Sequence, residues 1–144
     1  MKLDSDFTRS NALDNKFGQQ LATTADCFLR HLQSVLSKQK RYEAELASIA
    51  KSLVEFEQKP NAVDFANELN QLRGFHRYAS TQVKRLRMLI DPALRSYANP
   101  QRRDKAIDSI NRQTRQAISA LRELRLHWLA LSSTYCFMLG VVGI

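Results

Sequence analysis

Hydrophobic residues recur with helical spacing along most of this chain. In the first half they are three and four residues apart, except for one four–four step at the start and a polar interruption at Gln39. This spacing is typical of a helix that buries one side against other helices. It predicts a first helix over about residues 12–59, roughly 70 Å long at 1.5 Å per residue. The predicted buried side comprises Phe17, Leu21, Ala25, Phe28, Leu32, Val35, Gln39, Tyr42, Leu46, Ile49, Leu53 and Phe56.

The first helix should end at Lys59-Pro60-Asn61, because proline lacks a backbone N–H and disfavours helical geometry in the preceding residue. A second helix is predicted over about residues 62–126. Pro92 should bend it, and Asn99-Pro100 is a second weak point, with Pro100 a candidate first helical residue. We expect one long, bent helix here, and two shorter helices are the alternative. Its buried side comprises Leu69, Leu72, His76, Ala79, Val83, Leu86, Ile90, Ala93, Tyr97, Ile107, Ile110, Thr114, Ala117, Leu121, Leu124 and Trp128.

The two ends of the chain do not follow this pattern. Residues 1–11 form a polar lead-in that resembles neither a secretory signal nor a transit peptide. Residues 127–144 form an apolar tail with no charged residue after Arg125. Residues 128–144 reach only the lower length limit for a membrane span, and the hydroxyl groups of residues 132–135 weaken that interpretation. The alternatives are an apolar helix end, a tail from truncated or alternative coding, a tail anchor and an interfacial helix.

Composition supports a single all-α domain. The chain has 144 residues, of which 44% are hydrophobic and 25% charged, as in a globular protein. Four glycines and three prolines leave little turn chemistry for β-hairpins. Cys27 and Cys136 share no motif spacing, which favours a reducing compartment and a role as small hydrophobic residues.

Positive charge is concentrated in the second half. Residues 1–72 carry 9 basic and 10 acidic side chains, a net of −1, whereas residues 73–144 carry 13 basic and 4 acidic ones, a net of +9. In a continuous heptad helix the basic residues would form one stripe beside the apolar side. An anionic membrane or nucleic acid is the natural class of partner, and a solvated helix face without a partner is the alternative. The stripe comprises Arg73, Arg77, Lys84, Arg87, Lys105, Arg112, Arg115 and Arg122.

The sequence predicts no catalysis, cofactor or metal site. His31, His76 and His127 are far apart, and none has a Cys, Asp or Glu at metal-ligand spacing. No nucleophile-elbow, P-loop or glycine-rich fingerprint occurs. His76 belongs to the buried side, so we expect a packing role for it.

Three segments resemble the Chibby-interacting BAR-domain family. They are NKFGQQL, RYEAELASIAKSLVEFEQ and FANELNQLRGFHRYASTQVKRLRMLIDPALRSYA, and NRQTRQAISALREL resembles the family's continuation. The acidic-residue-plus-Pro and Leu-basic-x-Tyr arrangements of the family are matched by Asp91-Pro92 and by residues 94–97. The match covers about residues 15–125 and is a long-helix pattern, not a catalytic signature.

The resemblance implies a BAR fold of long bent antiparallel helices that dimerises into a curved rod and binds and bends anionic phospholipid membranes. It also implies a Chibby-like coiled-coil partner, a cytoplasmic location at the centriole or ciliary base, and a link to the mitochondrial inner membrane. By this resemblance, lipid binding would fall to Lys84, Arg85, Arg87, Arg95, Arg102, Arg103, Lys105, Arg112 and Arg115.

The chain departs from the family pattern after Arg125. We therefore expect a C-terminally truncated form, with the third helix missing or replaced by the apolar tail. The end of the first helix containing Phe17, Leu21 and Phe28 should meet residues 94–107 and be completed by a second chain, giving a homodimer. A coiled-coil adaptor without direct membrane binding is the alternative, with a tail-anchored version as its membrane variant. Nucleic acid is disfavoured because the aromatic residues lie on or near the apolar sides and not among the arginines.

Overall fold

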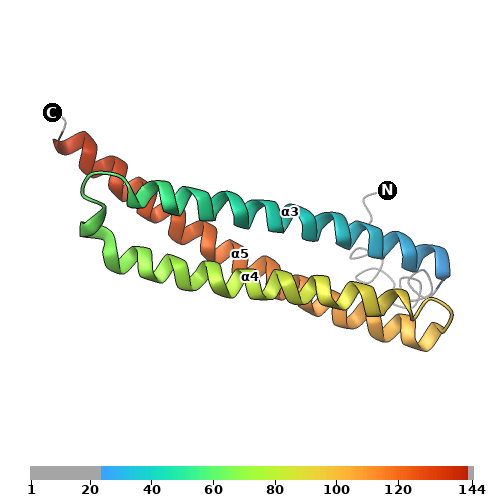
Figure 1. The fold of residues 1–144 in the computed structure, drawn as a ribbon. Coiled ribbons are helices and arrows are strands. Elements are labelled where there is room, and N and C mark those ends of the chain that lie inside the picture. Colours follow the sequence, from blue (N-terminus) through green and yellow to red (C-terminus); the bar gives the residue numbers. More distant parts are fainter. Residues whose placement is uncertain (1–23, 143–144) are drawn as a thin grey trace, which may run out of the picture.

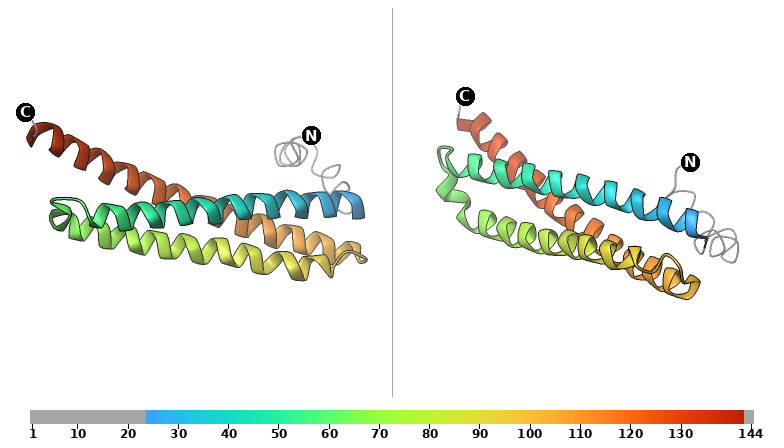
Figure 2. Two further views of the ribbon diagram at one scale, coloured as in Figure 1. Left: turned by 45° about the horizontal axis from the view of Figure 1, so that its top comes forward. Right: turned by 45° about the vertical axis from the view of Figure 1, so that its right-hand side comes forward.

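Three long helices make up residues 24–142, the part of the chain that the computed structural model describes (Figure 1). Helix α3 spans Ala25–Glu57, the short 3-10 helix η1 spans Ala62–Phe65, α4 spans Ala66–Leu94 and α5 spans Pro100–Val142. The all-α prediction is confirmed, and these residues contain no strand. Helices α3 and α4 form an antiparallel hairpin, and α5 runs back along both of them (Figure 2).

The break after the first helix lies where the sequence predicts it. Helix α3 ends at Glu57, and Asn61 adopts a left-handed backbone conformation with φ of 66°. Asparagine tolerates this conformation better than most residues, so it suits the turn. The predicted lead-in, residues 1–11, and the first twelve residues predicted for this helix, 12–23, lie outside the described residues.

The prediction of one long second helix is wrong. The chain leaves helical geometry after Leu94, and residues 95–97 donate to carbonyls only three residues back. Asn99 then caps a new helix, because its side-chain oxygen accepts from the backbone N–H groups of Gln101 and Arg102 at 3.0 and 3.1 Å. Pro100 is the first helical residue, as predicted. Pro92 lies in the last turn of α4 and not in the middle of a long helix.

A third helix is therefore present, and residues 127–142 are not a separate tail. They continue α5, with Leu131 and Tyr135 buried. The Tyr135 hydroxyl donates to the Pro60 carbonyl at 2.9 Å, which fixes this part of α5 against the α3–α4 turn. The last turns of α5 extend past that turn (Figure 2). No helix within residues 24–142 has an apolar stretch long enough to traverse a bilayer.

Two clusters of buried side chains form the core, and both contain residues from all three helices. One lies near the α3–α4 turn and includes Leu53, Phe56 and Leu124. The other lies at the opposite end and includes Phe28, Ile90 and Ile110. Most of the residues predicted on the buried sides are buried within the described residues. Tyr97 is exposed in the α4–α5 turn, and five others are half-buried: Ala25, Tyr42, His76, Thr114 and Trp128.

The end of the bundle around Phe28 is completed within one chain. Phe28 is fully buried, and Ile107 and Ile110 of α5 belong to the same buried cluster. The expectation that a second chain completes this end assumed a two-helix hairpin whose register Pro92 and Pro100 disturb. In the structure α5 folds back and Phe28 is buried within one chain, and the homodimer stays a prediction. Phe17 and Leu21 lie outside the described residues.

Candidate anion-binding surface

The nine predicted lipid-binding residues are divided between two antiparallel helices. Lys84, Arg85 and Arg87 belong to α4, Arg95 follows its end, and the other five belong to α5. Because the chain reverses at residues 95–99, the basic residues of α4 and those of α5 do not form the single predicted stripe. Eight of the nine are exposed, and Arg103 is buried.

Two polar contacts define the sides of α4. Arg73 pairs with Glu57 of α3, so its side of α4 faces α3. Gln82 accepts hydrogen bonds from Gln113 of α5 at 2.8 and 2.9 Å, so its side faces α5. Lys84 and Arg87 are 11 and 14 residues after Arg73 and therefore share the α3 side.

Arg85 lies on the α5 side of α4. It is three residues after Gln82 and four before Leu89, and residues with these spacings are neighbours on a helix surface. Leu89 lines a pocket of about 260 Å³ between α4 and α5. Arg102 and Lys105 of α5 line the same pocket.

The pocket combines positive charge, hydroxyl groups and an apolar floor. Its lining contains no carboxylate and no aromatic residue. Arg112 follows Lys105 by seven residues, so it continues the same side of α5. We call Arg85, Arg102, Lys105 and Arg112 the groove face. The remaining pocket residues are Pro92, Ala93, Ser96, Ala106 and Ser109.

Arg103 is buried in the bundle and stabilises the α4–α5 turn. It precedes the buried Ile107 by four residues and Ile110 by seven, so it points into the bundle and is 8% exposed. Its guanidinium donates to the carbonyl of Tyr97 and so ties the start of α5 to the α4–α5 turn. Because Arg103 is buried and tied to this turn, it does not belong to the exposed basic surface.

Arg95 and Arg115 are exposed but do not line the pocket between α4 and α5. Arg95 stands at the α4–α5 turn, seven residues after Met88. Arg115 is three residues after Arg112, about 60° further round α5. Four of the nine predicted residues thus share one groove, and five do not.

Two other arginines already have carboxylate partners. Arg73 pairs with Glu57, and the Arg125 guanidinium donates to both carboxylate oxygens of Glu45, with 2.7 Å to Oε1. That hydrogen bond raises the pKa of Arg125. Both pairs join α3 to another helix. Their carboxylates partly neutralise these two arginines, whereas the basic residues of the groove face are less compensated.

The histidines make packing contacts. His31 lies 3.1 Å from the Asn111 side-chain oxygen and joins α3 to α5. The His76 ring lies 2.8 Å from the Leu46 carbonyl, in keeping with the packing role expected for it. His127 stacks on Phe75 with 4.0 Å between ring centroids. No three His, Cys, Asp or Glu side chains in residues 24–142 gather closely enough to hold a metal ion.

The sequence pattern missed the pocket residues Leu89, Ser96 and Ser109. Their contribution depends on which sides of α4 and α5 meet, and that depends on the turn at residues 95–99. No family model, curated protein or solved structure matches this chain, so the resemblance to the Chibby-interacting BAR-domain family stays a prediction.

Proposed function

We propose that this chain is a non-catalytic helical module that binds anionic membrane surfaces through the groove face. The supporting observation is that the α4–α5 hairpin brings Arg102 and Lys105 into one pocket with Leu89, and aligns Arg85 and Arg112 beside it. A phosphate-bearing surface fits such a groove, because the lining supplies cations and hydroxyl donors without a competing carboxylate.

The expected binding is modest and sensitive to salt. Each basic side chain near an anionic surface contributes about 1 kcal/mol, and the attraction falls off within a Debye length. Asp108 precedes Arg112 by four residues and reduces the local field somewhat. Four groove-face cations therefore suit a reversible peripheral contact.

Membrane lipid is favoured over nucleic acid by the lack of a stacking platform. Only Tyr78, seven residues before Arg85, places an exposed aromatic ring on the same side of α4 among the described residues. Single-stranded nucleic acid binders stack successive bases on several such rings. A gel shift with mixed duplex and single strands distinguishes the two partners.

Co-sedimentation with liposomes tests the proposal. In the groove variant all four groove-face residues become Gln. The control variant loses the same number of charges elsewhere, through Arg77→Gln, Lys84→Gln, Arg87→Gln and Arg122→Gln. The groove variant should lose most binding to vesicles containing phosphatidylserine, and the control should keep most of it. Equal losses would show a diffuse charge effect, and full retention of phosphatidylserine binding by the groove variant would contradict an electrostatic contact through the groove face.

A second candidate is self-association through the distal half of α5. Leu126, Leu129 and Phe137 lie on one side of this helix and are 56, 59 and 71% exposed. A second copy of the chain, packed antiparallel, would cover the same side on both molecules. Sedimentation equilibrium of the native chain and of Leu129→Gln/Phe137→Gln checks this homodimer. A concentration-independent monomer would exclude it.

The Chibby-like partner, the ciliary base or centriole, membrane bending and the mitochondrial link remain predictions from the resemblance alone. They are consistent with a membrane-binding helical module, but the groove face would serve any anionic surface equally well.

A further inference from the structure

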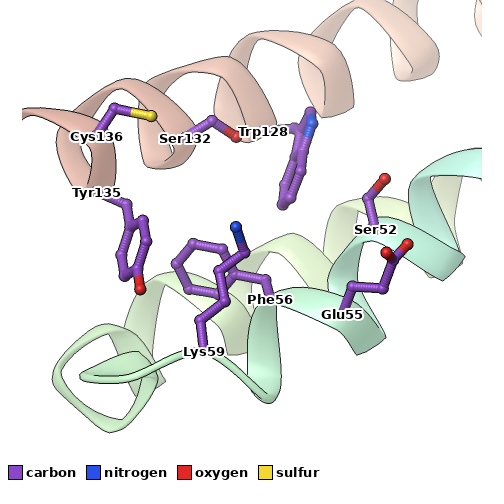
Figure 3. Close-up of a pocket in the computed structure, with 8 residues that line it drawn as sticks. All are labelled: Ser52, Glu55, Phe56, Lys59, Trp128, Ser132, Tyr135 and Cys136. Carbon is purple, nitrogen blue, oxygen red and sulfur yellow. The ribbon is translucent and has the colours of Figure 1, made fainter. Parts of the chain in front are cut away.

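We infer that a second pocket, between the end of α3 and the distal half of α5, binds a quaternary ammonium group of the choline type. This site is separate from the groove face and goes beyond the proposed function. It combines aromatic walls, a carboxylate and a lysine ammonium that already lies over one of the rings (Figure 3).

Aromatic side chains from two helices form the walls. Phe56 of α3 lies between Trp128 and Tyr135 of α5, with ring centroids 6.2 and 4.9 Å away, and both pairs pack edge to face. The pocket that these three side chains help to line has a volume of about 200 Å³. The buried Tyr135 is held by its hydrogen bond to Pro60, so these walls are built into the α3–α4 turn.

The pocket already attracts a cation from its own chain. The Lys59 ammonium lies over the Tyr135 ring, 5.5 Å from its centroid. Figure 3 shows the Lys59 side chain reaching past Phe56 toward the space between Tyr135 and Trp128. Aromatic faces carry negative potential and attract cations at this distance. Glu55, which also lines the pocket, adds a formal negative charge.

A quaternary ammonium group should displace the lysine. Lys59 is exposed and follows the end of α3, so its side chain can swing into solvent. A primary ammonium is strongly hydrated and loses that water when it is enclosed. A trimethylammonium group is bulkier and has no N–H to hydrate, and aromatic cages are the common device for recognising it.

Trp128 provides a direct reporter because it is the only tryptophan in the chain. Choline should change its fluorescence saturably. The neutral isostere 3,3-dimethylbutan-1-ol, which has the same shape without the charge, should bind at least about 10-fold more weakly. Equal affinities would overturn the proposal by showing a purely apolar pocket. Absence of saturable choline binding would overturn it as well.

Two surface variants sharpen the test without disturbing the core. Lys59→Gln removes the competing cation and should tighten choline binding about 3- to 10-fold, whereas Glu55→Gln should weaken it by a similar factor. Lys51→Gln is the matched control, an exposed lysine two helical turns earlier on α3 that does not line the pocket, and should change nothing. No effect of Lys59→Gln and Glu55→Gln would contradict a charged ligand.

Vesicles separate the two sources of the group. Phosphatidylcholine vesicles that compete with free choline, while phosphatidylethanolamine vesicles do not, identify a lipid headgroup as the ligand. Saturable binding of free choline that phosphatidylcholine vesicles do not reduce identifies a soluble ligand. These vesicles carry no net charge and no groove-face residue lines this pocket, so failure here leaves the proposed contact with anionic membranes unaffected.

Discussion

The side-chain oxygen of Asn99 accepts a hydrogen bond from the backbone N–H of Arg102 at 3.1 Å, and this contact starts α5 where a continuous helix would otherwise run. The same oxygen accepts from Gln101. Pro100 beside it has no backbone N–H. This costs nothing at the first position of a helix, because the N–H there has no partner within the helix. This short segment directs α5 back along α3 and α4.

Removal of this cap should therefore destabilise the whole bundle. We expect Asn99→Ala to lower the free energy of unfolding by about 1 kcal/mol, measured by urea denaturation. Gln116→Ala, at an exposed position of α5, is the control and should change stability by less than about 0.5 kcal/mol. A neutral Asn99→Ala would mean that packing alone determines the reversal.

The distal half of α5 should contribute to stability through Tyr135. Tyr135→Phe keeps the ring but leaves the Pro60 carbonyl without its donor, so we expect a loss of about 1 kcal/mol. Phe137→Ala changes an exposed ring two residues away and serves as the control. Thermal melts followed by circular dichroism compare the two. If both variants melt like the native chain, this part of α5 is not docked in solution.

The apolar spacing predicted the helices and most of the core, because the side that a helix buries follows from its own sequence. Phe28, Leu53 and Leu86 all lie where the spacing places them. The reversal of the chain at Asn99 could not be predicted in the same way. Its local signals are a cap and a proline, and the outcome depends on whether α5 gains more by covering Phe28 than by extending α4.

The groove face was only partly predictable for the same reason. The sequence identified the excess of cations, and Arg102 and Lys105 were among the candidates. Which cations share a surface depends on the reversal, which divided the predicted stripe and buried Arg103. The aromatic pocket had no sequence signal at all, because Phe56 and Tyr135 are 79 residues apart.

Stability should fall in mildly acidic solution through His31. Burial lowers the pKa of His31, although its hydrogen bond to Asn111 acts in the opposite direction. A histidine with a lowered folded-state pKa favours the fold in its neutral form. Its contribution to stability is fully present above the unfolded pKa of about 6.5 and is lost as the pH falls below that value. We expect a lower urea midpoint at pH 5.5 than at pH 7.5.

The His31→Gln variant isolates this effect. Glutamine does not titrate and its amide can donate to the Asn111 oxygen, so the variant should lose much of the pH dependence while keeping the interhelical contact. His127→Gln, at a less buried position of α5, is the control and should retain the native profile. Equal pH profiles for all three proteins would assign the acid sensitivity to carboxylates.

Gln39 offers the clearest case in which the fold should be improved by substitution. It is the polar interruption in the apolar spacing of α3, and its side chain is 0% exposed. Its amide nitrogen makes one long hydrogen bond, 3.5 Å to the Val83 carbonyl, and its amide oxygen has no hydrogen-bond partner among the described residues. A buried polar group without a partner costs about 1–3 kcal/mol, whereas leucine has nearly the same volume and no polar atom that needs a hydrogen bond.

We expect Gln39→Leu to stabilise the chain by about 1 kcal/mol in urea denaturation. Gln33→Leu, at an exposed position of the same helix, is the control and should leave stability nearly unchanged. Destabilisation by Gln39→Leu would instead indicate that the amide sets the register between α3 and α4.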